Sequence, residues 1–98
     1  MAKRKANEGY GTKLWVLTAV DEGVVRQLGV FTSEAYAVDD LLNRMDGEGV
    51  LGEVCRSLGC EDRAELSFQM CEQIARVGST TVNNDTTTFD IDSTILKR

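Results

Sequence analysis

The stretch Lys13-Leu-Trp-Val-Leu-Thr-Ala-Val20, the turn Asp21-Glu-Gly23 and the stretch Val24-Val-Arg-Gln-Leu-Gly-Val-Phe31 decide the fold. Two apolar runs of strand length flank an acidic turn that contains glycine, and this order predicts a β-hairpin. The turn suits a three-residue loop in which Gly23 takes a positive φ. Apolar residues occupy both alternations of the first run, which predicts an interior strand covered on both faces.

Three helices are predicted after the hairpin. Thr32 or Ser33 caps the first, and Glu34 in its first turn complements the helix dipole. The second is short, from about residue 50 to 58, and the third runs from Asp62 to about residue 77, where Gly78 ends it. The apolar stripes are Val38, Leu41, Leu42 and Met45 in the first helix, and Leu51, Val54, Cys55 and Leu58 in the second.

The third helix is apolar over about half of its circumference. One edge carries Ala64, Phe68, Cys71 and Ala75, and the other carries Leu66, Met70, Ile74 and Val77. A helix of this kind must bury two sides. It therefore either lies between the sheet and the other helices or forms a homodimer through residues 64–77.

The C-terminal part predicts one more strand. Residues 79–88 are rich in Ser, Thr and Asn, and Asn83-Asn84-Asp85 is predicted as a turn. Apolar residues then alternate with polar ones from Phe89 to Ile95, which indicates a strand with one wet face that pairs with the hairpin. The prediction is an α+β fold in residues 13–98: an antiparallel sheet of three or more strands with about three helices packed on one face. Residues 1–12 are predicted to form a mobile basic tail.

Composition argues against catalysis. The chain has 98 residues and no histidine, which removes the commonest general base and the usual transition-metal ligand. No glycine-rich phosphate loop links a strand to a helix. Three cysteines would leave a zinc site one ligand short, so Cys55, Cys60 and Cys71 are predicted as small core residues, with a redox pair of Cys55 and Cys60 as the alternative. We expect no enzymatic activity, no cofactor and no bound metal.

Two charged features each have a plainer explanation. Asp90 and Asp92 stand on one face of the predicted strand, as magnesium-binding carboxylates do, but a solvated edge strand shows the same alternation. The basic residues Lys3, Arg4 and Lys5 could add non-specific affinity for phosphate, although a solubilising terminus explains them as well. No signal peptide or membrane-spanning run is evident, which indicates the cytoplasm.

The first helix carries the candidate binding surface. The whole chain has a net charge of −5, whereas residues 14–96 alone sum to −10. Such an acidic body favours basic partners over nucleic acid, and it also keeps a small protein soluble. An aromatic side chain among acids on a helix's polar side is typical of a contact with a basic groove. The candidate partner-binding residues are Tyr36, Asp39, Asp40 and Asn43, with Asp46, Glu48 and Glu53 extending the negative field.

The segment from Lys13 to Leu42 resembles a pattern found in small bacteriophage proteins, most of them uncharacterised. The shared residues are Trp15-Val-Leu-Thr-Ala19, Asp21-Glu22, Gly29-Val-Phe-Thr-Ser33 and Glu34-Ala35. The resemblance implies a phage accessory protein, a class in which acidic chains of this size are often inhibitors of host defence, anti-CRISPR proteins among them. It implies no catalytic residues.

Three hypotheses follow. The first is a phage-encoded inhibitor, active in the host cytoplasm, whose acidic residues cover a basic nucleic-acid-binding surface of a host nucleoprotein complex, without direct nucleic-acid or membrane binding. The second is a structural or regulatory homodimer formed through residues 64–77. The third is a nucleic-acid accessory protein that uses the basic N-terminal tail.

Overall fold

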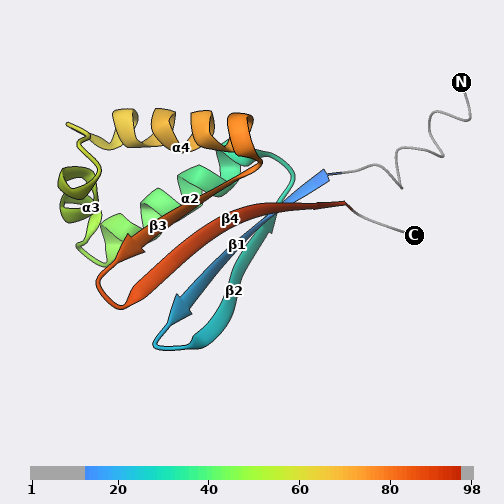
Figure 1. The fold of residues 1–98 in the computed structure, drawn as a ribbon, viewed down its shortest axis with the longest axis horizontal. Coiled ribbons are helices and arrows are strands. Elements are labelled where there is room, and N and C mark those ends of the chain that lie inside the picture. Colours follow the sequence, from blue (N-terminus) through green and yellow to red (C-terminus); the bar gives the residue numbers. More distant parts are fainter. Residues whose placement is uncertain (1–12, 96–98) are drawn as a thin grey trace, which may run out of the picture.

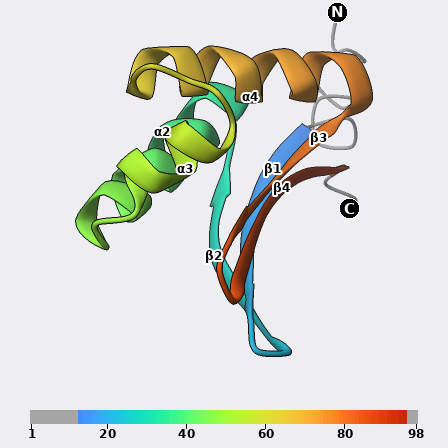
Figure 2. The ribbon, with the colours of Figure 1, turned by 60° about the vertical axis from the view of Figure 1, so that its left-hand side comes forward.

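Four antiparallel strands form one sheet, and three helices cover one of its faces (Figures 1 and 2). The computed structural model describes residues 13–95, so the predicted basic tail, residues 1–12, lies outside the described part. The elements are β1 (Lys13–Asp21), β2 (Val24–Phe31), α2 (Glu34–Gly47), α3 (Leu51–Ser57), α4 (Arg63–Val77), β3 (Ser79–Asn84) and β4 (Thr87–Ile95). The predicted α+β class and the position of the helices are confirmed.

The sheet has the strand order β2-β1-β4-β3, so β1 and β4 are its interior strands. The hairpin is confirmed, but its loop has two residues instead of the predicted three. Asp21 stays in the ladder opposite Val24, and Glu22 and Gly23 both have positive φ, 51° and 86°. This combination is that of a type I′ turn, whose twist matches the twist of the two strands.

The core lies between the sheet and the helices. Trp15, Leu17 and Ala19 of β1 point towards the helices and are buried. The opposite alternation, which includes Val16 and Val20, is half-buried, and no element within residues 13–95 covers it. The prediction that both faces of β1 are covered was therefore wrong. These residues are shielded sideways by their cross-strand neighbours on β2 and β4.

Strand β3 was not predicted from the sequence. The expected turn at residues 83–85 begins two residues later, at Asp85, because Asn83 and Asn84 pair with β4. Polar side chains support this pairing: Thr81 Oγ1 donates to Asp90 Oδ1 at 2.7 Å, and Thr88 Oγ1 donates to Asn83 Oδ1 at 2.8 Å. Because β3 occupies the edge, β4 is an interior strand, and the assignment of Asp90 to an edge strand was wrong.

The helix boundaries follow from their caps. Ser33 Oγ accepts a hydrogen bond from the Tyr36 N–H at 3.1 Å, and Asp62 Oδ1 accepts one from the Glu65 N–H at 3.0 Å. Gly78 ends α4 with a φ of 89°. The predicted apolar stripe of α2 is buried as expected. Within residues 13–95, no helix is both long enough and apolar enough to span a membrane.

Two apolar expectations need correction. Leu58 was predicted to face inwards, but α3 ends at Ser57 and Leu58 is 45% exposed. In α4, one predicted edge enters the core through its buried residues Leu66, Met70 and Ile74, but its fourth member, Val77, is 64% exposed. The other edge does not: Ala64, Phe68 and Ala75 are exposed, and Cys71 is half-buried.

Candidate functional site

The outer face of α2 collects most of the predicted binding residues. Their spacing of three or four positions places them together, opposite the buried stripe that anchors the helix. Tyr36 is 66% exposed, so its ring is available to a partner. The α2 outer face, as we define it, consists of Tyr36, Asp39, Asp40, Asn43 and Asp46.

Two of its carboxylates are held by arginines. Asp40 Oδ2 receives Arg44 Nε at 2.6 Å, and Asp39 Oδ1 receives Arg63 Nη2 of α4 at 2.8 Å. Both pairs are partly exposed, so each contributes at most about 1 kcal/mol to stability, but each fixes the direction of an acid. Neither pair was predicted. The four-residue spacing of Asp40 and Arg44 was a usable signal, whereas Asp39 and Arg63 are brought together by helix packing alone.

The remaining acids of the predicted surface divide into two places. Asp46 is exposed on the last turn of α2, and Glu48 is exposed just beyond it. Glu53 belongs to α3 and lines a separate hollow of about 300 Å³ beside residues 83–85. The structure therefore gathers a Tyr-centred acidic face on α2 and leaves Glu53 apart from it.

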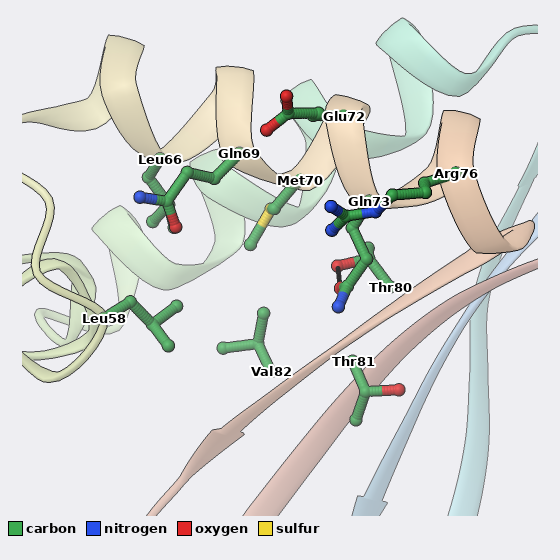
Figure 3. A pocket seen from close by; sticks show the side chains of 10 residues that line it. All are labelled: Leu58, Leu66, Gln69, Met70, Glu72, Gln73, Arg76, Thr80, Thr81 and Val82. Atoms are coloured by element: carbon green, nitrogen blue, oxygen red, sulfur yellow. Dashed lines mark hydrogen bonds between the residues drawn. The ribbon is translucent and has the colours of Figure 1, made fainter.

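A groove between α4 and β3 is a second candidate site, and it was not predicted from the sequence. It has a volume of about 350 Å³ (Figure 3). Leu66 and Met70 of α4 and Val82 of β3 form its apolar floor, and Leu58 lies on the side towards α3. The groove went unpredicted because residues 79–84 carry a single large apolar side chain, Val82, among Ser, Thr and Asn.

One end of this groove is closed by a hydrogen bond. Thr80 Oγ1 donates to Gln73 Oε1 at 2.5 Å and so ties β3 to α4 next to the turn at Gly78 (Figure 3). This bond satisfies Thr80, a buried polar residue of the core. The rim on the α4 side is polar and includes Gln69, Glu72 and Arg76.

Cys55 and Cys60 are buried and not disulfide-bonded, as predicted for small core residues, whereas Cys71 is only half-buried. Burial raises the pKa of Cys60, and the negative charge of Glu65 raises it further. Burial also raises the pKa of Cys71, assisted by Glu34 and opposed by a hydrogen bond from Ser67. Raised pKa values disfavour the reactive thiolate, so these thiols are poorly suited to nucleophilic chemistry.

The α2 outer face and the groove between α4 and β3 are the two candidate contact surfaces. Within residues 13–95, no cluster of three or more Cys, Asp or Glu side chains could hold a metal ion. Of the two β4 carboxylates, Asp90 is half-buried and bonded to Thr81, whereas Asp92 is exposed.

Comparison of the chain with protein families, with curated proteins and with solved structures gives no match.

Proposed function

We propose that this chain is a non-enzymatic, phage-encoded protein that binds and inhibits a nucleoprotein complex of the host defence, as anti-CRISPR proteins do. The observation that carries the proposal is the α2 outer face, where Tyr36 is 66% exposed among carboxylates. Tyrosine is enriched at the energetic centres of protein interfaces, and a surrounding negative field steers a basic partner towards it.

The ion pairs sharpen this picture. Arg44 and Arg63 orient the carboxylates of Asp40 and Asp39, which reduces the entropy lost when a partner binds, but they also offset two negative charges, so the field depends chiefly on Asp46 and Glu48. Asp46 and Asn43 are exposed and offer acceptors to lysine or arginine side chains. A partner that uses those side chains to hold nucleic acid phosphates would lose access to its nucleic acid, so inhibition would occur by occlusion.

The experiment is a pull-down from a bacterial lysate with the full chain, followed by identification of the captured protein. Tyr36→Ala should remove the captured partner. Phe68→Ala is a matched control, because Phe68 is also 66% exposed but belongs to α4. The complex should weaken as salt rises from low to physiological ionic strength. Capture by Tyr36→Ala equal to that of the wild type, or binding indifferent to salt, would contradict the proposal.

A second candidate function is the homodimer, and one observation favours it. The α4 edge formed by Ala64, Phe68 and Ala75 stays exposed, although burial of such an edge is favourable. Light scattering at micromolar concentrations distinguishes the two candidates. A dimer that dissociates in Phe68→Ala and persists in Tyr36→Ala would support the α4 interface. A monomer at all concentrations would exclude it.

A further inference from the structure

We propose that β3 and the groove beneath α4 bind an extended peptide segment of another protein. The peptide would add to the sheet as a fifth strand, place one apolar side chain in the groove and direct an acidic side chain to Arg76. This site is separate from the α2 outer face, and the proposal does not depend on the proposed function.

The main chain of β3 is available on one side. Within residues 13–95, β3 pairs with β4 alone and forms an edge of the sheet. The β3–β4 loop has two residues, so its closing pair, Asn84 and Thr87, exchanges hydrogen bonds. Alternation then directs the N–H and C=O groups of Thr80 and Val82 to β4, and those of Ser79, Thr81 and Asn83 to the free side.

Nothing in the sequence of β3 discourages pairing on that side. Edge strands are commonly protected by lysine, proline or a β-bulge. Residues 79–84 read Ser-Thr-Thr-Val-Asn-Asn, without a charge or a proline, and their register with β4 is uninterrupted. An unprotected edge strand is the template that strand addition requires.

The groove supplies the position for a side chain. A strand added beside β3 alternates its side chains between the two faces of the sheet, so every second one points towards the helix layer. There it would meet Leu66, Met70 and Val82, with Leu58 on the far side. The volume of about 350 Å³ accommodates one branched aliphatic or aromatic side chain.

The positive charge of Arg76 determines which residue is favoured beside that apolar side chain in the bound peptide. Arg76 lines the groove and makes no ion pair with any residue of the described chain, and the carboxylate of Glu72 on the same rim points away from the apolar floor (Figure 3). A carboxylate on the bound peptide would provide its partner, and a charge-assisted hydrogen bond of this kind is stronger than a neutral one. The favoured peptide therefore carries an apolar residue with Asp or Glu close to it.

The test uses a phage-displayed library of linear twelve-residue peptides selected against the full chain, followed by synthetic copies of the enriched sequences. Enrichment of an apolar residue beside an acid is expected. Bound peptide should slow amide hydrogen exchange at Ser79, Thr81 and Asn83 by at least about tenfold. N-methylation of alternate peptide amides should abolish binding in one register and spare it in the other, because only alternate amides face β3.

Two variants at one position isolate the main chain. Thr81→Pro and Thr81→Val both remove the side-chain hydrogen bond to Asp90, but only proline removes the outward N–H. We expect proline to weaken binding by about tenfold or more and valine to leave it nearly unchanged. Arg76→Gln should weaken binding of acidic peptides and leave neutral ones unaffected.

Three results would overturn the proposal. One is a selection without binders above background. Another is a set of peptides whose protected amides lie away from β3. The third is a free chain that self-associates through β3, shown by sedimentation and by loss of association in Thr81→Pro, because a second copy would then be the occupant. The peptide N-methylation series uses the wild-type protein, so it decides the matter even if Thr81→Pro does not fold.

Discussion

The two edges of the sheet are built differently. At the β2 edge, Leu28 is an extra residue in the pairing with β1, and its carbonyl oxygen accepts a hydrogen bond from Arg44 Nη2 at 3.1 Å. At the β3 edge, the register is regular, and within residues 13–95 no side chain binds the free main-chain groups. A bulge and an arginine close one edge, whereas the other has neither.

This difference shows that the unprotected edge is a local property of β3. Both outer strands belong to short hairpins with two-residue loops, and both lie against the same helix layer. Only β3 combines a free main chain with an adjoining groove.

The largest effect should come from proline on the paired side of β3. Val82→Pro removes a hydrogen bond to β4 and disturbs a buried side chain, so we expect a loss of about 3 kcal/mol or more in the free energy of unfolding. Thr81→Pro, one residue away, should lose less than about 1 kcal/mol because its N–H faces the free side. Urea denaturation of both variants measures the difference. Equal losses would mean that β3 has no free side.

A smaller effect is expected at Gly29, which follows the β2 bulge and lies close to the ring of Phe31. A Cβ atom on Gly29 would lie 2.8 Å from Cζ of Phe31, so Gly29→Ala must displace that ring. We expect a loss of about 1 kcal/mol. The cost should be smaller in a Phe31→Leu background, which a double-mutant cycle measures. Additive effects would show that the crowding is relieved elsewhere.

Removal of the arginine at the β2 edge should cost less again. Arg44→Ala loses an exposed ion pair and the hydrogen bond to the Leu28 carbonyl, about 0.5–1 kcal/mol together. Arg63→Ala is the matched control, because its ion pair with Asp39 lies between helices. Faster amide exchange along β2 in Arg44→Ala alone would confirm that Arg44 protects this edge. Identical exchange in both variants would refute it.

The smallest effect is the pH dependence of stability that comes from Cys60, which lies in the helix layer on the β3 side of the sheet. Its Sγ lies 4.0 Å from the carbonyl oxygen of Leu58, at the α3 end of the groove. The fold raises the pKa of Cys60 above its ordinary 9.0, so the folded state keeps a proton that the unfolded chain releases. This contribution to stability is complete at neutral pH and is lost as the pH rises above about 9. Stability of Cys60→Ala should therefore fall less steeply over that range, and parallel profiles would disprove the assignment.

Much of the fold could be predicted because local pattern and tertiary packing agree. Val24–Phe31 has the predicted bounds, and the stripe from Val38 to Met45 is buried as its spacing indicates. The β3 strand escaped prediction because its residues are almost all polar, so no alternation of apolar side chains marks it, although its partners lie close in sequence. Thr81 is bonded to Asp90, and Thr80 to Gln73, and neither partner is visible in a run of Ser, Thr and Asn.

The candidate sites were predictable to different degrees. Helical spacing alone placed Tyr36, Asp40 and Asn43 on one face, because periodicity determines which residues share a side. It did not place Arg63 beside Asp39, since that contact depends on how two helices cross. The groove required β3, α4 and the end of α3 together, so a pattern read along the chain could not reveal it.

The strand order has a consequence for biosynthesis. In the sheet, β1 pairs with β4, which begins about 65 residues after β1 ends. At ordinary elongation rates the ribosome therefore finishes β1 roughly 3–13 s before it starts β4. A two-stranded hairpin is at best marginally stable alone. During that interval Trp15 and Leu17 lack the β4 half of their final environment. The hairpin therefore becomes stable only after β4 has been synthesised and has paired with β1.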